Sequence, residues 1–304
     1  MRPKSCTLGS NSFERAKYMN TSASISLASD TKMQIIELVR NAARSEIMPR
    51  FQNLSAEHIA TKSRDDDLVT EADLASELRI TQGLQNMFPD AAIVGEEAIA
   101  KNPSLRDEMS EHEVCFVIDP IDGTWNFANG IPLFGVILSI LNFGRPIYGL
   151  LYDPVMDDYI EAHLEKGISA FCDRNNVRRP LKTATHRPTD ELSGYIHFGL
   201  MPKKTQFKLA PHLPKFRRTT VLRCSCHEYR ILAQGHMDFC LSSILNPWDH
   251  AAGVVTTQMA GGVSRMLDGQ DYNARITNGY LLSASSHTTW NAVAEILCPI
   301  LLDQ

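Results

Sequence analysis

The chain has 304 residues, with 30 Lys and Arg against 35 Asp and Glu, which gives a formal net charge of -5. This length suits one large domain or two closely packed ones, and a hydrophobic content of 43% is enough for a sizeable core. A nucleic-acid-binding protein usually carries a basic face, so this charge balance argues against a nucleic-acid partner. No stretch approaches the ~20 apolar residues that cross a membrane. Seven cysteines at irregular spacing predict buried thiols rather than disulfides, which is typical of the cytoplasm.

The first 29 residues differ in composition from the rest. They are rich in serine and poor in acidic residues, and they contain the basic residues Arg2, Lys4, Arg15 and Lys17. This pattern weakly resembles an organelle transit peptide, while Met19 offers an alternative start. We expect residues 1–29 to form a disordered extension. The protein is expected in the cytoplasm, with import into an organelle as the alternative.

Two helices are predicted in the first third of the chain. In the first, apolar residues recur at helical spacing from residue 30 until Pro49. The second begins near Thr70 and stops at Pro89. Thr70 with Asp73 three residues later fits a variant of the capping box, so Asp73 taken alone indicates a helix start as readily as a functional site.

The middle of the chain is predicted to form strands. The continuous apolar run of residues 114–118 is typical of a buried strand, and Asp119 stands at its end. Residues 133–141 and 147–152 predict two further strands that form a hairpin. Residues 174–220 are basic and in places rich in proline, so we expect loops mixed with strands there.

Helices return towards the end of the chain. Residues 228–233 are predicted helical, and another helix opens at Asp249, runs to Met259 and closes at Gly261-Gly262. Because helices and strands alternate around a central hairpin, we predict an α/β (α+β) fold with a partly antiparallel sheet. The domain is expected to span residues 30–304 in two packed halves, about 30–170 and 171–304.

The most informative segment is Asp119-Pro-Ile-Asp-Gly-Thr124, at the end of the buried strand. Asp119 precedes a proline and therefore favours extended backbone, and Gly123 allows a sharp turn. Two carboxylates in so rigid a turn repel each other unless a cation lies between them, and such hard oxygen ligands suit Mg²⁺. The backbone after Gly123 is expected to start a helical turn whose N–H groups face an anion. The alternative is a plain turn, in which Asp, Pro and Gly are all common.

Three more polar residues stand out, each with a structural alternative. Glu96 follows a glycine, as at a solvated helix start, and Lys62 lies in a polar stretch, as a surface lysine does. Asp249 opens a helix, where Asp is a common N-cap. The small residues that follow Asp249 would nevertheless let another element come close.

Taken together, these segments resemble the inositol monophosphatase family. Four motifs carry the resemblance in the family's order and at similar spacing: Asp67-Leu-Val-Thr-Glu-Ala-Asp73, Gly95-Glu-Glu97, Asp119-Pro-Ile-Asp-Gly-Thr-Trp-Asn-Phe127 and Trp248-Asp-His-Ala-Ala-Gly253. The resemblance covers most of residues 30–300. It implies a layered α-β-α-β-α sandwich, usually assembled as a homodimer, and a metal-dependent, lithium-sensitive phosphatase that acts on a small phosphorylated metabolite.

The resemblance also implies roles for individual residues. Two or three Mg²⁺ ions, or Mn²⁺ in their place, would be held by Glu96, Asp119, Asp122, Asp249 and the backbone carbonyl of Ile121. Glu96 and Thr124 would orient the nucleophilic water, Asp73 would support Thr124, and Lys62 matches a family lysine near the metals. The substrate would contact Asp122, Gly123, Thr124, Arg223, Ser225, Cys226, Ser242, Asn246 and Asp249, with the N–H groups of Gly123 and Thr124 on phosphate oxygens.

The substrate itself stays open at this stage. Inositol-selective members of the family carry an acidic residue about seven positions before the Asp of the Trp-Asp motif, and Ser242 occupies that position here. Trp125 also differs from the threonine that is typical of animal inositol enzymes. Three interpretations remain: a monophosphatase for inositol or a sugar-like alcohol, a phosphatase for histidinol phosphate or a nucleotide 3'(2'),5'-bisphosphate, and a non-catalytic protein that binds a phosphorylated ligand.

Overall fold

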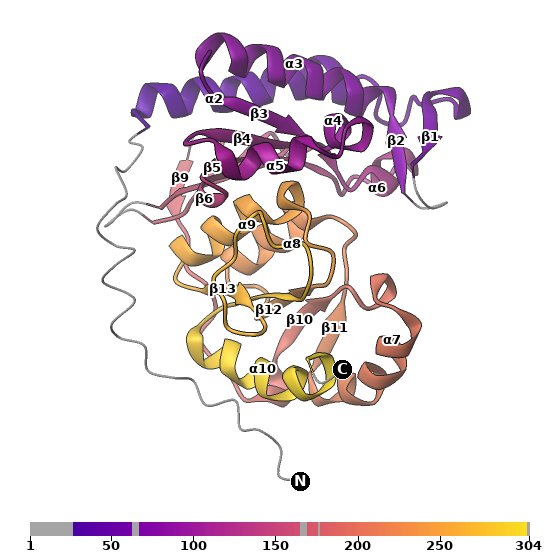
Figure 1. Ribbon diagram of the computed structural model, residues 1–304, viewed down its shortest axis with the longest axis vertical. Helices are drawn as coiled ribbons and strands as arrows, with labels where there is room; N and C mark the ends of the chain where they lie inside the picture. The colour runs from indigo at the N-terminus through magenta and orange to yellow at the C-terminus, as the bar shows by residue number, and fades with distance from the viewer. Residues whose placement is uncertain (1–26, 63–66, 165–168, 176, 303–304) are drawn as a thin grey trace.

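The chain folds into alternating layers of helix and sheet. The computed structural model describes residues 27–62, 67–164, 169–175 and 177–302 (Figure 1). From top to bottom in Figure 1 the layers are α2 (Ser29–Ala42) with α3 (Glu71–Met87), a seven-stranded sheet, α8 (Ser225–Ala233) with α9 (Pro247–Met259), a five-stranded sheet, and α7 (Lys203–Leu209) with α10 (His287–Leu301). The predicted α-β-α-β-α sandwich is therefore confirmed. Residues 1–26 of the extension expected over residues 1–29 lie outside the described residues, and its last residue, Ser29, already belongs to α2.

The seven-stranded sheet has its strands in chain order, β3-β4-β5-β6-β7-β8-β9. They are β3 (Ala92–Gly95), β4 (Cys115–Asp122), β5 (Gly135–Asn142), β6 (Arg145–Asp153), β7 (Asp158–His163), β8 (Phe171–Arg174) and β9 (Val177–Pro180). β3 and β4 pair in parallel, and each later neighbour pairs antiparallel. β5 and β6 are the predicted hairpin.

The five-stranded sheet has the order β11-β10-β12-β14-β13. Its strands are β10 (Ser193–Ile196), β11 (Arg218–Thr220), β12 (Phe239–Ser242), β13 (Val263–Met266) and β14 (Leu281–Ala284). The stretch 174–220, expected to hold loops and strands, also contains the helix α7. Seven residues are too few to show a clear helical period, and α7 is stabilised by packing against α10 instead.

Short elements complete the fold. They are the π-helical turn η1 (Ala43–Ile47), the 3-10 turns η2 (Ala56–His58), η3 (Thr189–Glu191), η4 (Phe198–Leu200) and η5 (Ala210–Lys215), the two-stranded sheet of β1 (Ile59–Thr61) and β2 (Leu68–Thr70), and the helices α4 (Glu96–Lys101), α5 (Leu105–Glu111) and α6 (Thr124–Ala128). The capping box predicted at Thr70 is present at the start of α3, where the Thr70 N–H donates to Asp73 Oδ2 at 2.8 Å.

The regular pairing of β4 is interrupted at its end, where Asp119 and Asp122 lie. All eight residues of β4 are buried; the apolar run predicted the first part of this strand, but the strand continues past Asp119 to Asp122. Pro120 has no N–H for the ladder, and the pairing with β5 shifts register between Asp119 and Asp122. Gly123 then turns the chain into α6 with a positive φ of 88°, a conformation that favours glycine.

Helix α9 lies directly against the underside of the seven-stranded sheet. A Cβ on Gly149 of β6 would stand 2.5 Å from the carbonyl oxygen of Ala252 and 2.8 Å from its Cα, so only glycine fits there. The small residues after Asp249 therefore allow the close approach that their size predicted. This packing sets the start of α9 beside the end of β4.

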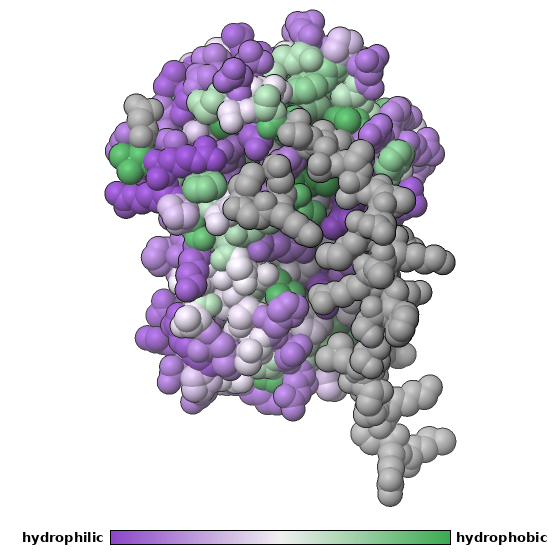
Figure 2. All heavy atoms as spheres, turned by 90° about the vertical axis from the view of Figure 1, so that its left-hand side faces the viewer, coloured by the Kyte–Doolittle hydropathy of each residue, from purple (hydrophilic) through white to green (hydrophobic). Residues whose placement is uncertain are grey.

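Hydrophobic and hydrophilic side chains are mixed on the described surface. Figure 2 shows one face on which hydrophobic patches lie among hydrophilic side chains. Within the described residues, no helix has the length and apolar character needed to span a bilayer. The six described cysteines are free thiols, of which four are buried as predicted, while Cys172 and Cys298 are half-buried.

Candidate active site

A cavity of about 390 Å³ opens where β4, α6 and the start of α9 meet. Ten residues predicted for the site line it: Glu96, Asp119, Ile121, Asp122, Gly123, Thr124, Arg223, Ser225, Asn246 and Asp249. Cys226 and Ser242 do not line it: the backbone N–H of Cys226 donates to Asp122 Oδ2, and Ser242 Oγ lies 3.4 Å from Nδ1 of the lining residue His197. Lys62 and Asp73 stand behind the lining and contact residues within it.

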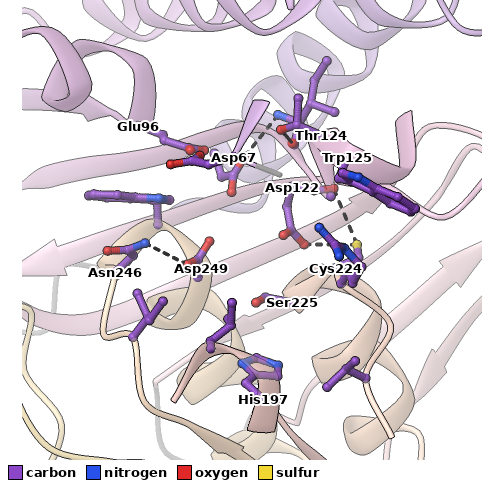
Figure 3. Close-up of a pocket in the computed structure, with 18 of the residues that line it drawn as sticks. Asp67, Glu96, Asp122, Thr124, Trp125, His197, Cys224, Ser225, Asn246 and Asp249 are labelled. Atoms are coloured by element: carbon purple, nitrogen blue, oxygen red, sulfur yellow. Dashed lines mark hydrogen bonds between the residues drawn. The ribbon is translucent and has the colours of Figure 1, made fainter. Parts of the chain in front are cut away.

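Three carboxylates from distant parts of the chain meet in this cavity. Oxygen atoms of Asp119, Asp122 and Asp249 all lie within 4.8 Å of one another. Figure 3 shows Glu96, Asp67, Asp122 and Asp249 around one space. Carboxylates separated by more than 100 residues thus share a volume that suits divalent cations.

The start of α9 places Asp249 in this group. Asn246 is the N-cap and Pro247 the first residue of α9, so the helix opens two residues before Asp249. Pro247 suits this position because its fixed φ is already helical. Asn246 Nδ2 donates to Asp249 Oδ2 at 3.2 Å and so helps to orient the carboxylate.

The three carboxylates disfavour one another's charge. Burial raises the pKa of Asp119 well above its ordinary value, and Glu96 and Asp122 raise it further. Burial and the charge of Asp122 do the same to the pKa of Asp249. Burial raises the pKa of Asp122 to about 6. A bound divalent cation would let all of them ionise, so this donor set fits a hard metal ion.

Asp122 is held from the opposite side of the cavity. Its Oδ2 accepts a hydrogen bond from the Cys226 backbone N–H at the start of α8 and from the Cys224 thiol, whose sulfur lies 3.1 Å away. Both thiols are buried, which raises their pKa values and makes thiolate chemistry unfavourable. Cys226 therefore acts on the site through its backbone, by fixing a carboxylate.

Thr124 and Asp73 form a second polar contact beside the carboxylates. Thr124 Oγ1 lies 3.2 Å from Asp73 Oδ1 and 2.9 Å from the Ile121 carbonyl oxygen. The other oxygen of Asp73 accepts the Thr70 hydroxyl at 2.5 Å. Burial raises the pKa of Asp73 to about 7. Asp73 thus caps α3 and supports Thr124 at the same time.

Lys62 balances the negative charge at the start of α4. Its Nζ lies 2.8 Å from Glu96 Oε1 and 2.5 Å from Glu97 Oε1. Burial alone would lower the pKa of Lys62, but the two carboxylates outweigh it and raise the pKa. Behind them, the buried Glu77 accepts the N–H groups of Glu97 and Ala98 at 2.8 and 2.9 Å. Glu96 is therefore held in the cavity wall by a cation and a capped helix start.

The inositol monophosphatase family model matches residues 28–300. The chain belongs to this family. Inositol-1-monophosphatase of Bacillus subtilis is 30% identical over 215 residues, which is 70% of this chain and 78% of that protein. Histidinol-phosphatase of Chlorobaculum parvum is 29% identical over 245 residues, 77% of this chain and 85% of that protein. Family membership makes this protein a phosphoric monoester hydrolase.

Solved structures agree with the fold. The IMPase of Thermotoga maritima superposes with a TM-score of 0.71 at 23% identity and covers 89% of this chain and 99% of its own. An inositol monophosphatase from Zymomonas mobilis gives a TM-score of 0.72 at 22% identity, with the same two coverages. The layered sandwich is thus that of inositol monophosphatases.

A second group of potential metal ligands, His197, Glu228 and Cys240, borders the cavity of this family member. Their donor atoms also lie within 4.8 Å of one another. Hydrogen bonds account for this group: His197 Nε2 lies 2.6 Å and Cys240 Sγ 3.8 Å from Glu228 Oε2. Glu228 Oε1 accepts the Leu222 N–H at 2.7 Å. With the donors already bonded to one another, the acidic group is the better metal site.

Several residues that line the cavity were not predicted from the sequence. Asp67, His197, Leu200, Val221, Ile244, Trp248 and His250 line the cavity without having been assigned to it. Asp67 and Trp248 stand at the ends of two recognised motifs, which is a usable signal. His197 follows the four-residue strand β10 in a stretch with no motif, so only the fold brings it to the site. Trp125, noted as a departure, stacks under Arg223 with the guanidinium carbon 4.3 Å from the ring centroid.

Proposed function

We propose that this chain hydrolyses the phosphate monoester of a small metabolite alcohol in a Mg²⁺-dependent reaction. One observation carries the proposal: the oxygens of Asp119, Asp122 and Asp249 lie within 4.8 Å of one another, in a cavity lined also by Glu96 and Thr124. Carboxylates crowded in this way bind hard divalent cations, and Mn²⁺ is the expected substitute.

The metal-binding set would be Glu96, Asp119, Asp122, Asp249 and the carbonyl of Ile121. Mg²⁺ held there would neutralise charge on the phosphoryl oxygens and acidify a water molecule. Asp122 presents one oxygen to the cavity because the other is held by the Cys226 N–H. Lys62 holds the Glu96 carboxylate in place.

Thr124 and Asp73 would handle the attacking water. The Thr124 hydroxyl can donate its one proton to Asp73 Oδ1 or to the Ile121 carbonyl, and its lone pairs can accept a hydrogen bond from a water in the cavity. Glu96 would orient the same water from the other side. Because burial raises the pKa of Asp73 to about 7, its carboxyl is suited to share a proton with Thr124 near neutral pH. The N–H groups of Gly123 and Thr124, at the start of α6, would meet phosphate oxygens.

The alcohol of the ester would leave towards Arg223, Ser225 and Asn246. Relatives named inositol-1-monophosphatase, histidinol-phosphatase and fructose-1,6-bisphosphatase/inositol-1-monophosphatase share the family, so inositol-like, sugar-like and histidinol esters are the candidates. We keep inositol- or sugar-like monophosphates as the first candidate and histidinol phosphate as the second.

Phosphate release from a substrate panel tests this proposal. Purified protein is assayed with inositol 1-phosphate, histidinol phosphate, adenosine 3',5'-bisphosphate and fructose 1,6-bisphosphate, with Mg²⁺ and after treatment with EDTA. We expect turnover that EDTA abolishes and excess Mg²⁺ restores. Binding of a phosphorylated ligand without any release of phosphate would instead favour a non-catalytic ligand-binding protein.

A further inference from the structure

The cavity has two chemically different ends. Figure 3 shows His197 at the opposite end from Glu96, with Asp249 and Ser225 between them. The acidic lining residues, Asp67, Glu96, Asp119, Asp122 and Asp249, surround the proposed metal site. The far end therefore has to recognise the leaving alcohol with other chemistry.

The wall next to His197 is largely apolar. Leu200 ends the short turn η4 that follows His197, and Val221 precedes Leu222, whose N–H binds Glu228. Leu200 and Val221 each keep 42% of their surface exposed, and both line the cavity together with Ile244. A hydroxyl group placed against these side chains would lose its water without gaining a hydrogen bond.

His197 is the polar group among these side chains, and it is held in one orientation. Its Nε2 donates to Glu228 Oε2 at 2.6 Å, and Glu228 is completely buried. Its Nδ1 lies 3.4 Å from Ser242 Oγ, longer than an ordinary hydrogen bond, so a ligand can compete for this nitrogen. Burial alone would lower the pKa of His197, but Glu228 raises it above its ordinary value, which favours a ring that donates at both nitrogens.

The imidazole of His197, and not the hydroxyl of Ser242 beside it, forms the cavity wall at this end. Ser242 is 1% exposed and does not line the cavity, whereas the neighbouring His197 does. A ligand at this end therefore meets an imidazole donor and aliphatic side chains. Residue 242 is a serine and contributes no carboxylate here.

We propose that this end of the cavity takes an alcohol built on an apolar or aromatic ring that bears a hydrogen-bond acceptor, and that His197 is the residue that recognises the acceptor. The inference rests on the proposed phosphatase function and, among the candidate esters, ranks a ring with few hydroxyl groups above the polyols that the chemistry of the metal site alone places first. Glu228 is the positioning residue that holds His197.

Two matched substrate pairs test the two parts of the inference. Cyclohexyl phosphate and inositol 1-phosphate share a six-membered ring and differ in five hydroxyl groups, so we expect kcat/KM to be about tenfold higher for cyclohexyl phosphate. 2-(Pyridin-3-yl)ethyl phosphate and 2-phenylethyl phosphate differ in one acceptor nitrogen, and we expect the pyridyl ester to be favoured about tenfold, mainly through KM.

Variants assign these preferences to residues. His197→Gln keeps a donor for Glu228 but moves it, and we expect the pyridyl-to-phenyl ratio of kcat/KM to fall to about one. His112→Gln is the matched control, because His112 also pairs with a glutamate at 2.7 Å, that of Glu108, and lies outside the cavity lining. Should His197→Gln fold poorly, Leu200→Asn on the exposed rim is expected to lower the cyclohexyl-to-inositol ratio several-fold.

The outcomes separate the inference from the proposed function. Wild-type ratios near one, a preference for inositol 1-phosphate over cyclohexyl phosphate, or an unchanged pyridyl preference in folded His197→Gln would each overturn the inference while phosphatase activity persists. If no ester is hydrolysed, the proposed function fails. Calorimetry then measures the dissociation constant of each ester, and the ratios are formed from these constants. Ratios that follow the expected pattern in either readout support the assignment of His197.

Discussion

Each carboxylate in the site works through the oxygen that its neighbours leave unused. Asp122 has one oxygen engaged by the Cys226 N–H and the Cys224 thiol. Asp73 has one oxygen engaged by Thr70, and its second lies beside Thr124. Such fixed partners orient a ligand atom before any ion arrives, which is the condition for strong electrostatic catalysis. Substitutions that keep the shape and change one oxygen are therefore the sharpest probes.

Replacement of Asp122 by Asn should abolish most of the activity and spare the fold. The amide keeps the size of the side chain but removes the charge that attracts the cation, so we expect kcat/KM to fall by about two to four orders of magnitude. Steady-state kinetics at saturating Mg²⁺ measure this loss, and circular dichroism checks the fold. Asp268→Asn, on an exposed turn, should behave as wild type. Near-normal turnover by Asp122→Asn would remove this residue from the metal site.

The hydroxyl of Thr124 can be tested by a pair of variants. Thr124→Val removes the donor that lies 2.9 Å from the Ile121 carbonyl and 3.2 Å from Asp73, and should lower kcat by about 100-fold. Thr124→Ser retains the hydroxyl and should keep activity within about tenfold of wild type. A pH–rate profile of both variants adds a readout of the Asp73 proton. Equal kcat values for the two variants would argue that the hydroxyl has no role.

At the scale of elements, the contact between β6 and α9 decides where Asp249 lies. The Gly149 backbone meets the Ala252 backbone with no room for a side chain. Because α9 is one stiff unit, this contact fixes the height of its first turn against the sheet, and with it the distance from Asp249 to the end of β4.

Gly149→Ala should therefore damage both stability and activity. The new methyl group would stand 2.5 Å from a carbonyl oxygen that belongs to backbone and cannot rotate away. We expect a loss of about 1–3 kcal/mol in the free energy of unfolding and a lower apparent affinity for Mg²⁺. Urea unfolding and a Mg²⁺ titration of activity measure the two effects. Gly199→Ala, where an added Cβ meets nothing within 4 Å, is the stability control; equal stability of the two variants would refute the packing argument.

The sequence was most informative where function and local backbone coincide. The strand before Asp119, the hairpin and the carboxylates themselves could all be predicted, because burial and turn chemistry leave a strong local pattern. The hold on Asp122 could not, because a backbone N–H such as that of Cys226 carries no residue-specific signal. His197 was missed for a related reason: a lone histidine after a short strand acquires a role only when β10, β12 and α8 come together.

For the whole molecule, the buried carboxylates couple stability to pH. Burial raises the pKa of Glu77 to about 7 from its ordinary value of 4.5, and that of Asp73 to about 7 from 3.8. A raised pKa means that the folded chain holds its protons more tightly than the unfolded chain. The stability from these groups is thus fully present below pH 4 and is lost as the pH rises through about 7.

Glu77→Gln isolates this effect, because an amide cannot ionise. In EDTA, the wild-type free energy of unfolding minus that of the variant should decrease by about 1–3 kcal/mol between pH 4.5 and 7.5. Denaturant unfolding at a series of pH values gives this difference. A difference that is constant or grows with pH would show that Glu77 is ionised throughout the range.

The position of α9 between the two sheets has a broader consequence. Asp119 and Asp122 belong to the upper sheet, whereas Asp249 sits on a helix that touches both sheets. Octahedral Mg²⁺ tolerates little departure from oxygen distances of about 2.1 Å. A shift of one sheet relative to the other would therefore change the affinity for Mg²⁺. The Mg²⁺ concentration that a variant far from the site needs for activity thus reports on the relative position of the two sheets.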